Sequence, residues 1–356
     1  MAPNFVRPNV RAMDGYTPGE QPGIGERVVK LNTNENPFQP SDLVVRAIRE
    51  IEPENLRRYP NPTADLFRIA AAKLLGLSKD QIIAGNGSDD VLTIATRAFV
   101  PPGGKLACPD PTYSLYPILA KLEDATCVPV PWEDGYTLPI DALLATKADA
   151  IYLANPNAPT GTFVPPAKIS HLAKAFSGLV LVDEAYVDFA EENCVSLVKE
   201  HRNVVVSRSL SKAYALAGLR FGYAVAREDV IEEMMKVKDS YNCDAISIIA
   251  ATAAIEDQEY ARKTWEHVKD ERKRLGDELT SMGYTVIPSQ ANFLLVGCPG
   301  GRGKETYLGL KRQGILIRYF DKPGLSDKIR ITVGQSHENN ALLGGLKNLT
   351  AAEKAA

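Results

Sequence analysis

Short runs of hydrophobic and β-branched residues recur along the middle of the chain, and stretches long enough to form helices separate them. Short buried strands that alternate with helices are typical of a mainly parallel sheet covered on both faces. The pattern therefore predicts an α/β fold in which helices sandwich a mainly parallel sheet. The predicted strands are residues 81–84, 105–108, 150–154, 179–182, 204–206 and 221–226.

Helical periodicity appears on both sides of this region. Ser41 can cap a helix whose hydrophobic positions share one face, and a second helix is expected over 63–75, ended by Gly76. A long helical pattern over 258–282 is expected to connect the large domain to a smaller α+β domain. In that smaller domain the predicted strands are 285–287, 292–296, 315–318 and 328–332, and the predicted helices are 303–313 and 336–349.

The length of 356 residues suits two domains, or one large domain with an accessory lobe. The first forty residues are rich in Pro, Gly and Asn and have little periodicity, so we expect them to form an extended arm. The predicted division is an N-terminal arm over 1–40, a large domain over 41–265 and a small C-terminal domain over 266–356.

Composition and charge argue against several kinds of function. The 41 Lys and Arg against 44 Asp and Glu give a net charge of -3 without long like-charge runs, which disfavours nucleic acid and membrane surfaces as partners. The hydrophobic stretch 246–255 is too short to span a bilayer, and the N-terminus lacks the continuous hydrophobic segment of a secretory signal. We therefore expect a cytoplasmic location.

Cysteine and histidine are too scarce and too scattered to suggest a disulfide framework or a metal site. The five cysteines never form a CxxC pair, and the four histidines show no metal-binding spacing. Any chemistry must therefore rest on other residues.

Polar residues follow five successive predicted strands, at the place where a ligand site would form. In an open parallel sheet, ligands bind beyond the carboxyl ends of the strands. These ends carry an amide-rich turn, a tyrosine, an Asn-rich turn, an acid with a tyrosine, and two serines with a lysine. The segments are GNGSDD, PDPTY, NPNAPTG, DEAYVDF and SRSLSK.

Together these groups meet the three requirements of pyridoxal 5'-phosphate (PLP). Turn amides that open a helix, two serine hydroxyls and a guanidinium could bind one phosphate. Lys212 could present an amine beside that phosphate. Asp183, at the end of a hydrophobic strand, needs a cationic partner, which a protonated pyridine nitrogen would supply. The phosphate-binding candidates are Gly87, Ser88, Asp89, Ser209, Ser211 and Arg220.

Each feature alone has a simpler explanation. The glycines could form a βα turn, Lys212 could be a solvated surface amine, and Asp183 with Glu184 could cap a helix. Their joint occurrence, one at each strand end, favours the cofactor site. The chain has no GxxxxGK[ST] and no GxSxG motif, and the early GIGERV lacks the third glycine and the preceding strand of a dinucleotide site.

These residues resemble those of fold-type I PLP-dependent enzymes, and the chain is similar to the histidinol-phosphate aminotransferase family of class II aminotransferases. The resemblance covers nearly the whole chain. Its most specific part holds Lys212 and Arg220, and the N-terminal YTPG and LNTNENPF segments point to the histidinol-phosphate branch. Other matching segments are YPNP, GNGSDD, PTYSLY, NPNAPTG, VDEAYVDF, SLSKAYALAGLRFGY, PSQANFLLV and IRITVGQ.

The resemblance implies a role for each cofactor-binding residue. Lys212 would form a Schiff base with PLP, Asp183 would pair with the pyridine nitrogen, and Tyr186 would hydrogen-bond the phenolic oxygen. Tyr113 would stack on the ring. Tyr59 would reach the phosphate from a neighbouring subunit, which implies a homodimer with shared active sites, to which the N-terminal arm contributes.

One position departs from the family pattern. The family usually reads NPNNPTG, and the asparagine directly before PTG assists the cofactor's phenolic oxygen. Here that position is Ala158. Asn157 or Asn155 is expected to take over, with Asn157 as the preferred cofactor contact.

The resemblance also implies the substrate-binding residues. Arg330 matches the arginine that binds the α-carboxylate, a task suited to the geometry of guanidinium. Arg318 and Tyr16 match groups that bind a distal phosphate, and Asn36 and Tyr59 are further candidates. For the two arginines, the simpler alternative is an exposed charge on a strand.

The implied activity is a ping-pong transamination of histidinol phosphate with 2-oxoglutarate, in histidine biosynthesis. The expected partners are a small-molecule amino-group donor and a 2-oxo acid, and in the biosynthetic direction imidazole-acetol phosphate and glutamate react. Free Lys212 would act as the general base. An aromatic amino acid aminotransferase and a phosphothreonine decarboxylase are alternatives within the same branch. A PLP-fold regulator without turnover is a further alternative, which the intact Lys, Asp and Arg set disfavours.

Overall fold

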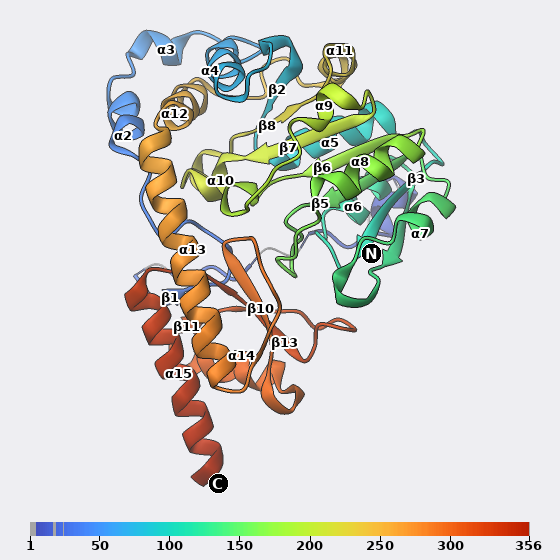
Figure 1. Ribbon diagram of the computed structural model, residues 1–356. Coiled ribbons are helices and arrows are strands. Elements are labelled where there is room, and N and C mark those ends of the chain that lie inside the picture. Colours follow the sequence, from blue (N-terminus) through green and yellow to red (C-terminus); the bar gives the residue numbers. More distant parts are fainter. Residues whose placement is uncertain (1–4, 17–18, 24, 356) are drawn as a thin grey trace.

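A seven-stranded sheet forms the centre of the larger part of the molecule (Figure 1). The computed structural model describes residues 5–16, 19–23 and 25–355. The strands are β2 (Ile82–Gly85), β3 (Lys105–Asp110), β4 (Thr126–Pro131), β5 (Ala150–Ala154), β6 (Leu179–Asp183), β7 (Val204–Ser209) and β8 (Gly222–Val225). In the order β2-β8-β7-β6-β5-β3-β4, only β8 runs antiparallel to its neighbours. The predicted mainly parallel sheet is confirmed.

Helices cover both faces of this sheet, as the hydrophobic pattern predicts. Successive side chains of a strand point to opposite faces, and β5 shows this directly. Tyr152 packs in one hydrophobic cluster, and its neighbours Ile151 and Leu153 pack in the other. The first cluster includes α5 (Ser88–Phe99), α6 (Tyr116–Leu122) and α11 (Glu228–Val237); the second includes α2 (Asp42–Arg49), α4 (Asp65–Leu75), α7 (Ile140–Ala145), α8 (Pro166–Ala175) and α12 (Ala245–Glu256).

A smaller part follows, reached along the long helix α13 (Gln258–Ser281), which extends down one side of the molecule (Figure 1). Its sheet has the order β12-β13-β10-β9, and a separate two-stranded ladder joins the N-terminal arm to it, because β1 pairs in parallel with β11. The elements are β1 (Val29–Lys30), β9 (Thr285–Val286), β10 (Phe293–Gly297), β11 (Ile315–Leu316), β12 (Arg318–Tyr319), β13 (Lys328–Thr332), α14 (Gly303–Arg312) and α15 (Ser336–Ala355).

Local signals predict the helix ends well. The side chain of Ser41 accepts a hydrogen bond from the backbone N–H of Val44 at 3.4 Å, and so caps α2. Gly76, with φ +64°, ends α4 in the left-handed conformation.

Several elements differ from the sequence prediction, and three of them have a clear physical reason. The expected strand 315–318 is two short strands in different sheets, because the chain changes partner at Ile317. Strand β4 was not predicted, since it is an edge strand that contains two prolines and has only one buried residue. Helix α3 (Pro53–Arg57) was also not predicted, because its five residues bury no side chain and so leave no hydrophobic pattern.

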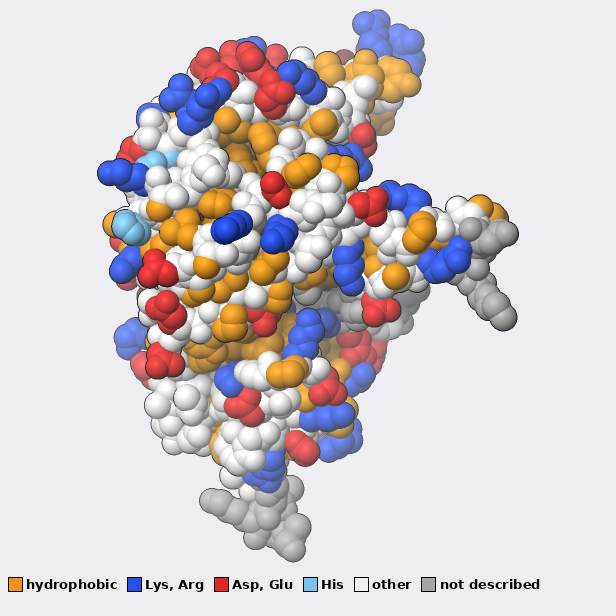
Figure 2. Space-filling view, turned by 90° about the vertical axis from the view of Figure 1, so that its right-hand side faces the viewer, with side chains coloured by type: hydrophobic (Ala, Val, Ile, Leu, Met, Phe, Trp, Pro, Cys, Tyr) orange, Lys and Arg blue, Asp and Glu red, His pale blue; other side chains and the backbone are white. Residues whose placement is uncertain are grey.

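Surface charge is mixed on the face that Figure 2 shows, where basic and acidic side chains are interspersed and neither sign dominates. No helix among the described residues is long and apolar enough to cross a membrane. Within the same residues, no three His, Cys, Asp or Glu side chains gather in a way that could hold a metal ion.

Candidate active site

A cavity of about 520 Å³ lies at the carboxyl ends of the large-sheet strands, where the arm and the smaller sheet meet them. Each of the three parts contributes side chains to its wall. The structure brings twelve of the predicted site residues to this cavity: Tyr16, Ser88, Asp89, Tyr113, Asp183, Tyr186, Ser209, Ser211, Lys212, Arg220, Arg318 and Arg330.

Lys212 lies on the short helix α10 (Leu210–Ala213), which follows β7 directly. Its Nζ donates a hydrogen bond to the backbone oxygen of Thr33 in the arm, at 3.0 Å. Burial and, after it, the positive charge of Arg330 lower the pKa of this amine from 10.5 to about 8, against the opposing effect of Glu35. Near neutral pH a larger fraction of Lys212 is therefore neutral, and hence nucleophilic, than of a lysine with the ordinary pKa.

Asp183 ends β6 and is 4% exposed. Its carboxylate accepts hydrogen bonds from the hydroxyls of Tyr116 at 3.0 Å and Ser207 at 3.3 Å. Burial nevertheless raises its pKa from 3.8 to about 6. No lysine or arginine among the described residues forms an ion pair with it, so this buried carboxylate fits a cationic ligand group such as a protonated pyridine.

Groups that could bind a phosphate lie at the N-terminus of α5. Gly87 precedes the helix with φ +88°, and the amides of Ser88 and Asp89 open it. Arg220 donates to the Ser211 hydroxyl at 3.3 Å and pairs with the Asp89 carboxylate at 3.5 Å. Only glycine fits at two positions beside this turn. A Cβ on Gly87 would lie 2.8 Å from Arg220 Nη2, and a Cβ on Gly222 would lie 2.4 Å from the Ser88 nitrogen.

Two tyrosines line the cavity together with Lys212 and Asp183. Tyr113 donates to Asp89 at 3.1 Å, and burial raises the pKa of its hydroxyl well above the usual range. The hydroxyl of Tyr186 accepts a hydrogen bond from Asn34 Nδ2 at 3.0 Å. Its pKa is also raised, mainly by burial. Both phenols therefore stay protonated at neutral pH and can donate hydrogen bonds.

Two arginines from the smaller sheet also line the cavity. Arg318 on β12 and Arg330 on β13 are direct partners in the antiparallel ladder, and both guanidinium groups lie over the ring of Phe320 at 5.4 and 5.5 Å. Arg330 donates to the backbone oxygen of Asn32 at 3.1 Å, but its Nε is buried without a partner. Burial lowers its pKa, with Arg318 adding to the effect. A carboxylate would satisfy this unpaired donor.

Asn157, Asn155 and Asn36 are not among the residues that line the cavity. Asn157 is fully buried and uses its amide within its own loop, donating to the oxygens of Pro111 and Thr160 and accepting from Thr112. Asn155 pairs in the same way with the backbone of Val164. Asn36 donates to the backbone oxygen of Ala213. Both asparagines of the Asn-rich turn are thus used to shape it.

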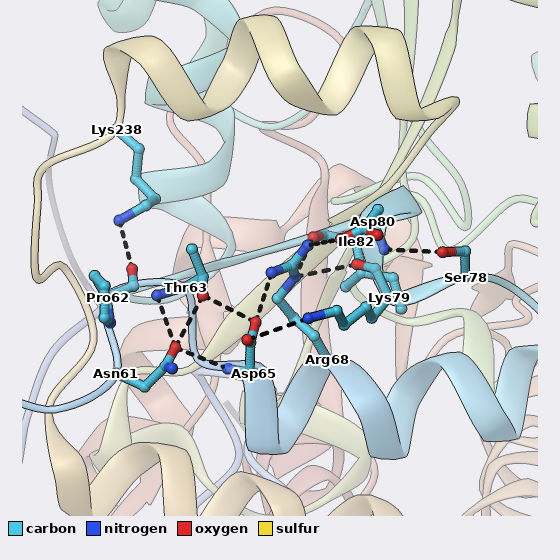
Figure 3. Close-up of polar contacts among 10 residues, drawn as sticks. All are labelled: Asn61, Pro62, Thr63, Asp65, Arg68, Ser78, Lys79, Asp80, Ile82 and Lys238. Atoms are coloured by element: carbon cyan, nitrogen blue, oxygen red, sulfur yellow. Dashed lines mark hydrogen bonds and ion pairs between the residues drawn. The ribbon is translucent and has the colours of Figure 1, made fainter.

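Tyr59 is 81% exposed and also lies outside the cavity. Its ring stacks on Tyr241 at 4.5 Å. The segment that follows is tightly held (Figure 3): Asn61 Oδ1 accepts from the backbone of residues 63 and 65, and Lys238 donates to the backbone oxygen of Pro62. The buried Arg68 guanidinium bonds Asp65, Asp80 and the backbone of Ile82 in the same view. Tyr59 is therefore presented to solvent on a fixed support.

Sequence reasoning gave no role to several residues that the structure places in or behind the cavity. Asn34 and Phe320 line it, and Tyr116 supports Asp183 from behind. Asn34 lies inside LNTNENPF and Tyr116 inside PTYSLY, two of the matching segments. Their presence there was the only available signal, because no local pattern reveals a contact across the fold. Of the YTPG segment, residues 17 and 18 lie outside the described residues.

Comparisons with known proteins agree with the resemblance. The family described as aminotransferase class I and II matches residues 26–345. Histidinol-phosphate aminotransferase 1 of Nostoc sp. is 46% identical over 97% of this chain and 98% of its own. The histidinol-phosphate aminotransferase of Rhodopirellula baltica is 45% identical over 95% of this chain and 93% of its own.

Solved structures agree as well. The histidinol-phosphate aminotransferase of Sinorhizobium meliloti, solved in complex with pyridoxal-5'-phosphate, has a TM-score of 0.88 at 26% identity, covering 98% of this chain and 99% of that one. An aspartate aminotransferase of Thermus thermophilus has a TM-score of 0.79 at 20% identity over 97% of this chain and 99% of that one, which indicates a shared fold. The expected fold-type I architecture is confirmed.

The match to the Nostoc protein covers 97% of this chain. It therefore includes the residues that line the cavity, from the arm to the arginines of the smaller sheet. The chain therefore belongs to the aminotransferase class I and II family and, within it, to the histidinol-phosphate aminotransferases.

Proposed function

We propose that this protein is a PLP-dependent aminotransferase that interconverts histidinol phosphate and imidazole-acetol phosphate, with glutamate and 2-oxoglutarate as the other pair, in histidine biosynthesis. The observation that carries the proposal is one cavity that holds a buried unpaired carboxylate, an amine with a lowered pKa, a phosphate cup and two opposed arginines. The names of the full-length relatives support the choice of substrate.

The residues present would hold PLP by its distinct groups. The cup formed by the α5 amides, Ser209, Ser211 and Arg220 would bind its phosphate, Asp183 its ring nitrogen, and Lys212 its aldehyde carbon. Tyr186 would donate to its phenolic oxygen, and Tyr113 would lie against its ring. When bound, PLP supplies an electron sink for the charge that develops at the substrate Cα.

The chain's own groups would then orient the substrate and move one proton. Arg330 would bind the α-carboxylate of glutamate through its unpaired Nε. Nζ of Lys212 would take the proton from Cα, since its lowered pKa makes the free amine an effective base near neutral pH. Arg318 would bind the distal phosphate of histidinol phosphate, together with the hydroxyl of Tyr16.

A homodimer is part of the proposal. Leu66 and Ile69, one turn apart on α4, are 54% and 57% exposed, and Leu56 on the neighbouring α3 is 61% exposed. Exposed hydrophobic side chains that gather in this way are typical of an interface. Tyr59, exposed and stacked on Tyr241, would reach the phosphate cup of the second subunit. We also propose the division into an arm over 1–40, a cofactor domain over 41–265 and a small domain over 266–356.

A substrate panel tests the activity, and Arg318→Ala tests the distal phosphate site. We expect turnover with histidinol phosphate to exceed that with phenylalanine, tyrosine and phosphothreonine. Loss of a charge-assisted bond to phosphate should raise KM for histidinol phosphate by about 10- to 100-fold. KM for phenylalanine should not change, and the exposed Arg312→Ala on α14 should alter neither value. An equal rise for phosphorylated and unphosphorylated substrates would contradict the phosphate role.

A further inference from the structure

The hydroxyl of Tyr186 is held by a residue of the arm that lies 152 positions away in sequence. Asn34 is 1% exposed and lines the cavity beside Tyr186. Its Nδ2 donates to the Tyr186 oxygen at 3.0 Å. This contact joins the arm to the loop after β6.

The direction of this hydrogen bond follows from its neighbours. Thr332 Oγ1 accepts from the backbone N–H of Asn34 at 3.0 Å, so its own proton is available to Asn34 Oδ1 at 3.2 Å. With Oδ1 used as the acceptor, the NH₂ end of the amide faces Tyr186. An amide NH₂ can only donate, so the tyrosine oxygen accepts and its proton must point elsewhere.

The backbone of Asn34 is also fixed. Its φ is +55°, a left-handed conformation that asparagine tolerates better than most residues. The side chain of Asn292 donates to its carbonyl oxygen at 2.9 Å. The amide is therefore already oriented before any ligand binds.

The Tyr186 ring packs against the apolar side chains of Ala158 and Phe293, which offer the hydroxyl proton no acceptor. The charged and titratable groups that act on the hydroxyl are Arg330 on β13, Asp183 on β6 and Tyr16 on the arm. The open direction for the proton is the cavity itself.

We propose that Asn34 is a positioning residue that makes the Tyr186 hydroxyl a hydrogen-bond donor into the cavity, toward the phenolic oxygen of PLP. This role rests on the proposed PLP site. Asn34 thereby supports the oxygen contact from the arm, in a chain whose Asn-rich turn lines the cavity with Ala158 and Pro159 rather than with an asparagine.

The test is the pH titration of the visible absorbance of bound PLP, without substrate. Asn34→Gly removes the side chain but keeps the left-handed backbone accessible, and Asn34→Asp keeps the shape but turns the donor into an acceptor. Without a donor from Tyr186, the phenolic oxygen holds a proton more strongly. Both variants should raise the titration midpoint by about one pH unit.

A double-mutant comparison separates this role from a structural one. In a Tyr186→Phe background there is no hydroxyl to orient, so Asn34→Gly should no longer shift the midpoint. Thr332→Ser, which keeps the supporting hydroxyl, should leave it unchanged. Thermal unfolding of each variant reports any effect on the fold separately.

Two results would overturn the assignment: a midpoint that stays at the wild-type value in both Asn34 variants, or an equal shift with and without the Tyr186 hydroxyl. Because no substrate is present, an error in the proposed substrate would not affect the outcome. A wild-type chain that bound no PLP would overturn both the proposed cofactor site and this role.

Discussion

A buried carboxylate without a cationic partner, such as Asp183, makes the protein without cofactor less stable than it could be. Its pKa is about 6 in the folded chain, against 3.8 as the ordinary value, so the folded state favours the protonated form. At low pH, Asp183 is protonated and its burial does not destabilise the folded state. As pH rises through 6, Asp183 becomes charged and the folded state loses stability relative to the unfolded state. Two units of pKa correspond to about 3 kcal/mol at neutral pH.

Asp183→Asn should therefore stabilise the cofactor-free protein at neutral pH by up to about 3 kcal/mol, because it removes this buried charge. The gain should fade below pH 4, where both proteins carry a neutral group. With PLP added, the variant should lose nearly all turnover, since nothing would hold the ring nitrogen protonated. Thermal unfolding across pH measures the first effect, and a variant less stable than wild type at neutral pH would contradict it.

Lys212 gives a second prediction at the level of a single residue. Only a neutral amine can add to the cofactor's aldehyde, so the rate of PLP incorporation into the cofactor-free protein should rise with pH and level off above about 8. Arg330→Gln removes a positive charge that lowers the pKa of Lys212, and should move the profile to higher pH. Stopped-flow absorbance measures both profiles. A rate that does not change through pH 8 would rule out the lowered pKa.

The turn between β2 and α5 shows how two elements together build a binding group. The helix supplies free N–H groups, and the close approach of β8 fixes the turn that presents them. The sequence shows the glycines of GNGSDD as a possible turn, but it does not show that Gly222, far along the chain, must also lack a side chain.

Gly222→Ala should weaken PLP binding tenfold or more, because the added Cβ would displace the Ser88 amide, and a hydrogen bond to a charged group contributes about 1.5 to 3 kcal/mol. Gly218→Ala is the matched control, since a Cβ there has no neighbour within 4 Å among the described residues. Equilibrium titration with PLP gives both affinities. Equal affinities for the two variants would show that the close approach does not matter.

At the scale of the whole molecule, the proposed dimer should depend on the exposed face of α3 and α4. Replacing Leu66 and Ile69 together by lysine should reduce the mass in solution from twice the chain mass of 38.8 kDa to that mass, and turnover should fall with it. Leu308→Lys, at a 40% exposed leucine of α14, should leave the dimer intact. Sedimentation velocity gives the mass. A double variant that stays dimeric would place the interface elsewhere.

The sequence by itself determined the fold class and the kinds of chemical group at each strand end. Strand and helix periods are local properties, so β5 and β13 have the predicted bounds, and the lysine, aspartate and arginines were identifiable from short segments. Two strands did not follow from the local pattern. Strand β4 is too exposed to show a hydrophobic run, and the strand expected over 315–318 divides where the chain changes partner.

Only the tertiary structure decided which side chains face the cavity. Asn157 and Asn34 both lie in segments that match the family. The Asn157 side chain forms its hydrogen bond within its own loop, whereas the Asn34 side chain donates to Tyr186 from a distant part of the chain. The opposed pair Arg318 and Arg330 likewise depends on strand register. The physical reason is that a polar group turns toward whichever partner the packed chain places within hydrogen-bond distance, and that partner can be far away in sequence.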